Sequence, residues 1–146
     1  MSNQNVNVLN SVTKTLIDSC KGYETCADMS DDSYALRAEF NRRATERRAL
    51  VNEFQHQVRT YGGEPKDDGS LSGVVHRGFT KFTGLFKDDE KAAVEALDDG
   101  EEFLAEKIEG KLDHDDLAPE TRTLLKRAHS SARAGERFAD LLEKSM

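Results

Sequence analysis

Residues 33–61 read SYALRAEFNRRATERRALVNEFQHQVRTY, and the sequence GGEP follows at 62–65. Within the stretch, one set of positions recurs every three or four residues, the period at which side chains share one face of a helix. These positions are Leu36, Phe40, Ala44, Arg47, Val51, Phe54, Val58 and Tyr61. Two glycines and a proline then end the pattern. The stretch therefore predicts a long amphipathic helix whose apolar face carries one charged residue, Arg47, near its middle.

The same period occurs on both sides of this helix, and turn-forming residues separate the segments. Pro119 suits the first turn of a last helix. Between the second and third long segments, Leu71, Val75, Phe82 and Phe86 share a face despite nearby glycines, which indicates a shorter helix. The sequence thus predicts a single all-α domain over residues 1–146, with helices near 6–27, 33–61, 70–86, 89–112 and 119–144.

The lengths of the connections predict how these helices are arranged. Short connections make neighbouring helices antiparallel, so the first two and the last two form hairpins. The long link at 62–88 allows the second and third long helices to run parallel. The expected fold is therefore a ferritin-like four-helix bundle with one long crossover that contains a short fifth helix.

Composition and charge exclude several classes of partner. The formal net charge is −7, so a phosphate backbone would be repelled, and we expect no nucleic-acid partner. No stretch approaches the roughly 18 apolar residues of a membrane span, so we expect no membrane partner. Cys20 and Cys26 would lie about 9 Å apart on one helix, too far to pair with each other. Free thiols and an N-terminus unlike a secretion signal favour a cytoplasmic location.

Several short motifs resemble those of an uncharacterised bacterial family of ferritin-like four-helix-bundle proteins, a domain of unknown function. They are Leu-Ile-Asp-Ser-Cys-Lys at 16–21, Arg43 with Arg47, Tyr-Gly-Gly-Glu-Pro at 61–65, Ser-Gly-Val-Val-His-Arg-Gly at 72–78 and Gly100-Glu101. The resemblance extends from about residue 8 to residue 142. It implies a ferritin-like fold and carries no settled activity.

A ferritin-like bundle raises the hypothesis of a di-iron or di-manganese site. Such a site needs one inward glutamate from each of two helices and a Glu-x-x-His pair from each of the other two. Glu24 and Glu101 are the candidates for the lone glutamates, about 60° and 40° from the apolar lines of their helices. Glu53 and His56 have the right spacing, but they lie about 100° and 160° from the apolar line. The sequence therefore predicts no bound metal and no cofactor.

Arg47 suggests what occupies the middle of the bundle instead. An unpaired buried charge is very costly, so an arginine at a core position needs carboxylates. We predict a polar core network in which Glu24 and Glu101 pair with Arg47 or Arg43. A guanidinium there would also repel a metal cation. The competing interpretation is that Arg47 reaches the edge of the bundle and binds nothing in particular.

No motif in the sequence requires catalysis, so we predict no catalytic residues and a non-catalytic helical module, with a role in stress or in protein contacts. The alternative is a di-iron or di-manganese protein or oxidase of the ferritin-like class. Phe79, Phe82 and Phe86 on the crossover would form an apolar patch if the bundle does not cover them. They are the predicted contact of a homodimer.

Overall fold

The computed structural model describes residues 2–30, 32–67 and 90–146, and every regular element within these ranges is an α-helix. The helices are α1 (Ser2–Met29), α2 (Tyr34–Thr60), α3 (Glu90–Leu112) and α4 (Pro119–Ser145). The four predicted long helices are therefore present, in an all-α arrangement. The predicted short helix at 70–86 lies outside the described residues, and so do Phe79, Phe82 and Phe86.

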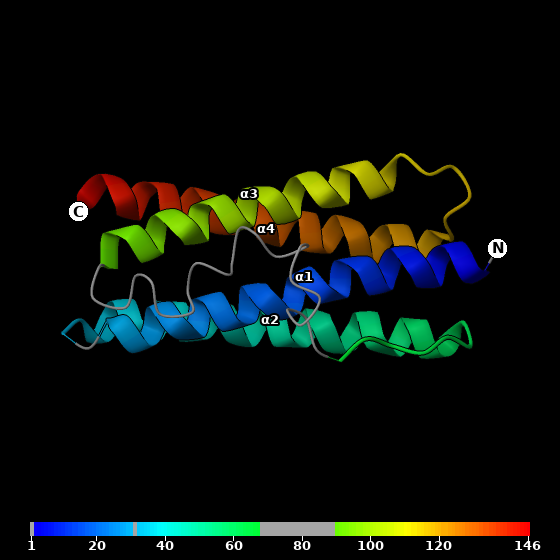
Figure 1. Ribbon diagram of the computed structural model, residues 1–146, viewed down its shortest axis with the longest axis horizontal. Coiled ribbons are helices and arrows are strands. Elements are labelled where there is room, and N and C mark those ends of the chain that lie inside the picture. Colours follow the sequence, from blue (N-terminus) through cyan, green and yellow to red (C-terminus); the bar gives the residue numbers. More distant parts are fainter. Residues whose placement is uncertain (1, 31, 68–89) are drawn as a thin grey trace.

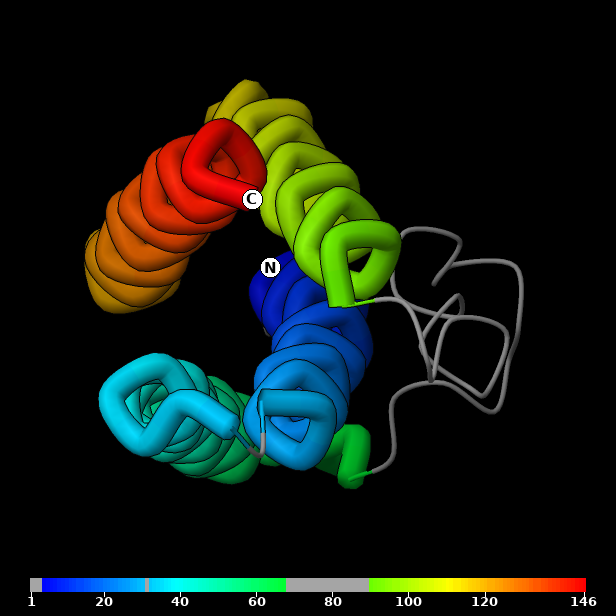
Figure 2. Tube along the Cα trace, turned by 90° about the vertical axis from the view of Figure 1, so that its left-hand side faces the viewer, coloured from blue at the N-terminus to red at the C-terminus, as the bar shows by residue number. Residues whose placement is uncertain are grey.

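The four helices form two antiparallel hairpins that lie against each other (Figure 1). One hairpin is α1 with α2, and the other is α3 with α4. Figure 1 also shows that α2 and α3 run in the same direction, as the long connection between them allows. In the end-on view of Figure 2, α1 lies between α2 and α3, and it packs against both, whereas α2 and α4 touch only sparsely.

Local sequence explains where α2 begins and ends. Ser33 has an extended backbone, and its hydroxyl accepts a hydrogen bond from the Leu36 amide at 3.3 Å, which caps the first turn. At the other end Gly62 has φ of +80°, a conformation that side chains disfavour. The amides of Gly62 and Gly63 donate to the carbonyls of Arg59 and Val58, both at 2.9 Å. This pattern is a Schellman motif, and it turns the chain back after the helix.

The first helix starts at Ser2, four residues before the apolar period predicted. The reason is polar packing, which a hydrophobic period does not detect. Asn5 is buried at 5% exposure, and its side-chain oxygen accepts a hydrogen bond from the Ala118 amide at 2.9 Å. The bond joins the beginning of α1 to the beginning of α4.

The apolar core consists of two clusters along the bundle axis. One surrounds Leu16, Phe54 and Leu104, and the other surrounds Phe40 and Leu97. Burial of such side chains is the main stabilising contribution to the fold, at roughly 25 cal/mol per Å² of apolar surface. Within the described ranges, none of the helices combines the length and apolarity that a membrane crossing needs. Where the two clusters meet, α2 and α3 contribute charged residues instead of apolar ones.

Candidate functional site

An ion pair between Arg47 and Glu101 lies at the junction of the two apolar clusters. Arg47 follows Ala44 of one cluster by one helical turn and precedes Leu50 of the other. Arg47 is 1% exposed and Glu101 is 0% exposed. The periodicity of each helix therefore directs both charges into the middle of the bundle, where water cannot reach them.

The two groups meet in a fork. Nη1 of Arg47 donates to Oε1 of Glu101 at 2.7 Å, and Nη2 donates to Oε2 at 2.6 Å. This bidentate geometry is the strongest form of an arginine–carboxylate bond. The remaining donors of Arg47 are directed at Ser131, whose hydroxyl and carbonyl oxygens each accept at 3.0 Å. Ser131 in turn donates to Glu46 at 2.9 Å, which connects the buried pair with the surface.

Tyr23 and Gly135 complete the surroundings of the pair. The Tyr23 hydroxyl donates to Oε2 of Glu101, and the Arg47 guanidinium lies 5.4 Å from the centre of the Tyr23 ring. A Cβ atom built on Gly135 would overlap both Oε2 of Glu101 and the Tyr23 hydroxyl. Only glycine at this point of α4 leaves space for the carboxylate. Every helix of the bundle therefore contributes to this layer.

The electrostatics of the layer favour the ionised pair. Burial alone would lower the pKa of Arg47, but the charge and hydrogen bonds of Glu101 outweigh burial and raise it above its usual value. Burial, with the Glu101 charge beside it, raises the pKa of Tyr23 well above its usual range. Arg47 thus stays cationic and Tyr23 stays neutral at physiological pH. Neither group is available as a base.

The other two residues predicted for the network have different partners. Glu24 is exposed and forms an ion pair with Arg48. Arg43 is half-buried, binds Glu39 at 2.9 Å, and places its guanidinium 4.5 Å from the centre of the Phe138 ring. The structure thus brings together Arg47 and Glu101 and leaves Glu24 and Arg43 on the flanks. The interpretation in which Glu24 faces Arg47 needs correction, because its offset from the apolar line turns it toward the edge between α1 and α2.

Sequence reasoning did not assign Tyr23, Ser131 and Gly135 to the layer. Tyr23 lies on the apolar face of its helix, where a hydroxyl needs a partner when it is buried. Ser131 and Gly135 lie four residues apart on a face of α4 made of small residues. A small face opposite a buried arginine indicates room for a large polar group, and this was the signal available in the sequence.

The residues with metal-ligand spacing on α2 lie at the surface. Arg127 donates to both carboxylate oxygens of Glu53, at 2.5 and 2.8 Å, and His56 is exposed. A contact between a carboxylate and a histidine, Glu109 and His129 at 2.7 Å, is also on the outside. The Glu-x-x-His pair of α2 therefore points away from the ion pair.

Three carboxylates, those of Asp98, Asp140 and Glu143, come together near the end of α4. Each has an oxygen within 4.8 Å of the others, and among the described residues no second group of this kind occurs. Burial, then the charge of Glu143, raises the pKa of Asp98 to about 7. The three groups repel one another, and Asp98 carries a proton part of the time at neutral pH.

The two thiols are buried and packed. The Cys20 sulfur donates to the Ala44 carbonyl at 3.1 Å, and burial raises its pKa to about 11. Burial also raises the pKa of Cys26 far above its usual value. Since the thiolate is the reactive form, neither sulfur is suited to act as a nucleophile at neutral pH.

Comparisons with known proteins identify a family for the chain but no activity. No curated protein and no solved structure gave a significant match to the chain. The residues matched by a family model are 4–113, which include α1, α2 and α3 with both members of the buried ion pair. The model is described as a domain of unknown function, DUF2383, and the chain belongs to this family.

Proposed function

We propose that the protein is a non-catalytic module of the ferritin-like type, in which an internal ion pair occupies the place of a metal centre. The direction of the helices supports the ferritin-like assignment. Two hairpins with a long link between α2 and α3, which run in the same direction, are the connectivity of that class (Figure 1). Connectivity alone does not carry a function, and the central layer of the bundle is the more specific feature.

The observation that carries the proposal is the bidentate contact between Arg47 and Glu101. In ferritin-like metal proteins, inward carboxylates and histidines from four helices surround two metal ions. Here the one fully buried glutamate gives both oxygens to a guanidinium, at 2.6 and 2.7 Å. The guanidinium bears the same sign of charge as a metal cation and already binds both oxygens of this carboxylate. A cation would have to displace it at the cost of an unpaired buried charge.

The alternative function, a di-metal oxidase or storage protein, gives Glu101 and Arg47 different roles. It requires Glu101 to bind metal and Arg47 to move out of the core. Glu53 and His56, which have the spacing of a ligand pair, are on the outer side of α2, with Glu53 held by Arg127. Their helix would have to rotate by roughly a quarter to a half of a turn to supply ligands.

Metal analysis of the purified full chain separates the two functions. We expect no stoichiometric iron or manganese after dialysis, and no absorption of oxidised iron when ferrous ion and oxygen are added. The matched control is the variant Asp98→Asn with Glu143→Gln, which neutralises two of the three clustered carboxylates near the end of α4. Metal that is lost in this variant is bound at the surface and leaves the proposal intact. Two iron ions per chain that persist in the variant would overturn it.

A further inference from the structure

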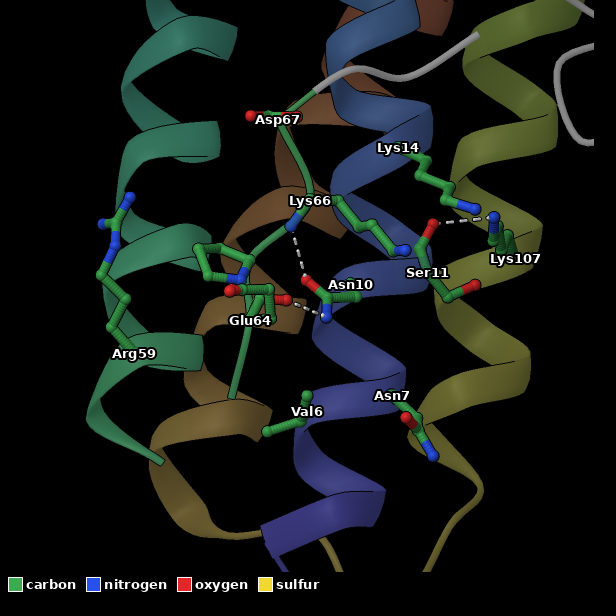
Figure 3. Close-up of a pocket in the computed structure, with 11 residues that line it drawn as sticks. Val6, Asn7, Asn10, Ser11, Lys14, Arg59, Glu64, Lys66, Asp67 and Lys107 are labelled. Carbon is green, nitrogen blue, oxygen red and sulfur yellow. Dashed lines mark hydrogen bonds between the residues drawn. The ribbon is translucent and has the colours of Figure 1, made fainter. Parts of the chain in front are cut away.

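A groove with an excess of positive charge runs along the side of α1, and the described residues that line it include neither Arg47 nor Glu101. Its volume is about 1030 Å³, at the upper limit of the range of small-molecule sites. Residues from α1 and α3 form one wall, and the segment 64–67 that follows α2 forms another (Figure 3). The charged residues that line it are Lys14, Arg59, Lys66, Lys107, Glu64 and Asp67. Four cations face two carboxylates, in a protein whose net charge is −7.

Hydrogen bonds hold the wall that follows α2 in place. The side-chain nitrogen of Asn10 donates to the backbone carbonyl of Glu64 at 2.9 Å, and its side-chain oxygen accepts from the backbone amide of Lys66 at 3.0 Å (Figure 3). Gln55 donates to the Lys66 carbonyl at 2.7 Å. The segment is therefore fixed to both α1 and α2, and the groove is formed before any ligand arrives, which lowers the cost of binding.

Lys107 is the most unusual cation of the groove. Its ammonium group is partly buried and donates to the Ser11 carbonyl and the Thr15 hydroxyl, both at 2.9 Å. Both acceptors are neutral. Burial, and then the positive charges of Lys111 and Lys14, lower its pKa to about 8. The site therefore concentrates positive charge without the anion that would stabilise it.

Three other buried or half-buried cations of the bundle do have such an anion, whereas the half-buried Arg122 donates to the backbone carbonyls of Leu112 and His114. Arg47 binds Glu101, Arg43 binds Glu39, and Arg133 binds both Glu109 and Glu136. Among the residues that the structure describes, no carboxylate forms an ion pair with Lys14, Lys66 or Lys107. Figure 3 shows the side chains of these three lysines extending toward the α1–α3 side of the groove.

We propose that this groove binds a phosphate-bearing small molecule, with its phosphate between Lys14, Lys66 and Lys107. Three separate ammonium groups can each approach a different oxygen of a tetrahedral phosphate, whereas planar carboxylates are matched better by the fork of an arginine. The hydroxyl of Ser11 and the amide of Asn7 line the same groove and can bind uncharged parts of the ligand. The proposal concerns a different region from the ion pair and does not depend on the proposed function.

Binding of a phosphate in the groove should change the number of protons bound to Lys107. A phosphate next to Lys107 favours its charged form and raises its pKa, which is about 8 in the free protein. Near pH 8 the free protein carries about half a proton on this amine, so binding draws protons from the solution. An anion that attaches to other surface lysines would produce no such uptake linked to Lys107.

Titration calorimetry of the full chain at pH 8, with inorganic pyrophosphate as the probe, tests the proposal. Two buffers of different ionisation enthalpy report the protons exchanged. We expect saturable binding, weakened about tenfold in Lys14→Gln and in Lys107→Gln. Because pyrophosphate also exchanges protons at this pH, the contribution of Lys107 is the difference between the two proteins, and the wild type should take up more protons, or release fewer, than Lys107→Gln. Lys126→Gln is the matched control, because it removes the same charge from an exposed position on α4. It should bind like the wild type.

Four outcomes would overturn the proposal. They are no saturable binding, equal weakening by Lys126→Gln, a net proton exchange that is the same with and without Lys107, and tighter binding of citrate or of a single-stranded oligonucleotide than of pyrophosphate. Circular dichroism establishes that each variant is folded. If Lys107→Gln does not fold, Lys14→Gln decides the outcome, because no hydrogen bond from the Lys14 side chain to the described residues would be lost. Unchanged affinity in Lys14→Gln then contradicts the proposed site.

Discussion

Two cations of the bundle, Arg47 and Lys107, differ in how their positive charge is stabilised away from water. Arg47 is almost completely buried and has a dedicated carboxylate, Glu101, in a fork of two short bonds. Lys107 is only partly buried, and its partners are a carbonyl and a hydroxyl. The pKa of Arg47 is raised and that of Lys107 is lowered. The difference indicates that one charge serves the fold and the other is available to a ligand.

Removing one member of the buried pair tests the contrast between Arg47 and Lys107 most strongly, because it should have the largest effect on stability. In Arg47→Ala, Glu101 would remain in the core as an unpaired charge, so we expect the free energy of unfolding to fall by about 3–5 kcal/mol. Chemical denaturation followed by circular dichroism measures this loss. Arg48→Ala is the matched control, since it removes an exposed arginine one residue away that pairs with Glu24. Its cost should be below about 1 kcal/mol.

The double variant Arg47→Met with Glu101→Leu sharpens the test. It replaces both charges by apolar side chains of similar size, and it should recover most of the stability lost in Arg47→Ala. A loss of less than about 1 kcal/mol in Arg47→Ala would mean that the charge of Glu101 escapes to water. The pair would then not be the feature that closes the centre of the bundle.

Gly135→Ala tests the space that the pair needs. The added methyl group would overlap Glu101 and the Tyr23 hydroxyl, so the carboxylate must shift and its fork to Arg47 must distort. We expect a loss of about 1–3 kcal/mol in unfolding free energy, in the range of overpacked cores. Gly110→Ala is the control, because a Cβ there meets no atom within 4 Å. In that variant a gain is expected, since alanine favours a helix by about 1 kcal/mol over glycine.

These residues also indicate how far a sequence can be interpreted. Arg47 could be identified because a single charge interrupts a regular apolar face, and Glu101 because it lies close to the equivalent line on α3. Whether Glu24 reaches Arg47 or Arg48 depends on how α1 is rotated against α2, and side chains of both helices decide that together. A difference of about 60° in helix rotation separates the core from the edge.

The groove could not be predicted, because it depends on where the chain goes after α2. The glycine and proline residues at 62–65 predict that the helix stops, and Gly62 does take the left-handed conformation of a helix end. The sequence does not indicate that Asn10, in the third turn of α1, holds the segment that follows α2. Such contacts between distant polar residues have no periodic signature.

Lys107→Met has the smallest expected effect on stability, and it tests the contrast between Lys107 and Arg47 most specifically. Because the pKa of Lys107 is about 8 in the folded protein and higher in the unfolded chain, whose usual value is 10.5, the folded state binds fewer protons between these values. Stability contributed by this residue therefore rises as pH increases from about 8 to 10.5, and it is lowest below pH 8. The variant lacks that rise, so it should be slightly more stable than the wild type at pH 7, by less than about 1 kcal/mol after allowance for solvent screening.

Thermal unfolding at several pH values between 7 and 10 measures the difference between this variant and the wild type. The difference should shrink as pH rises, whereas Lys126→Met, which loses an exposed ammonium on α4, should remain parallel to the wild-type curve. A Lys107→Met protein that is less stable than the wild type at pH 7 would show that the ammonium stabilises the bundle. Lys107 would then resemble Arg47, and the distinction between a charge that serves the fold and a charge available to a ligand would no longer hold.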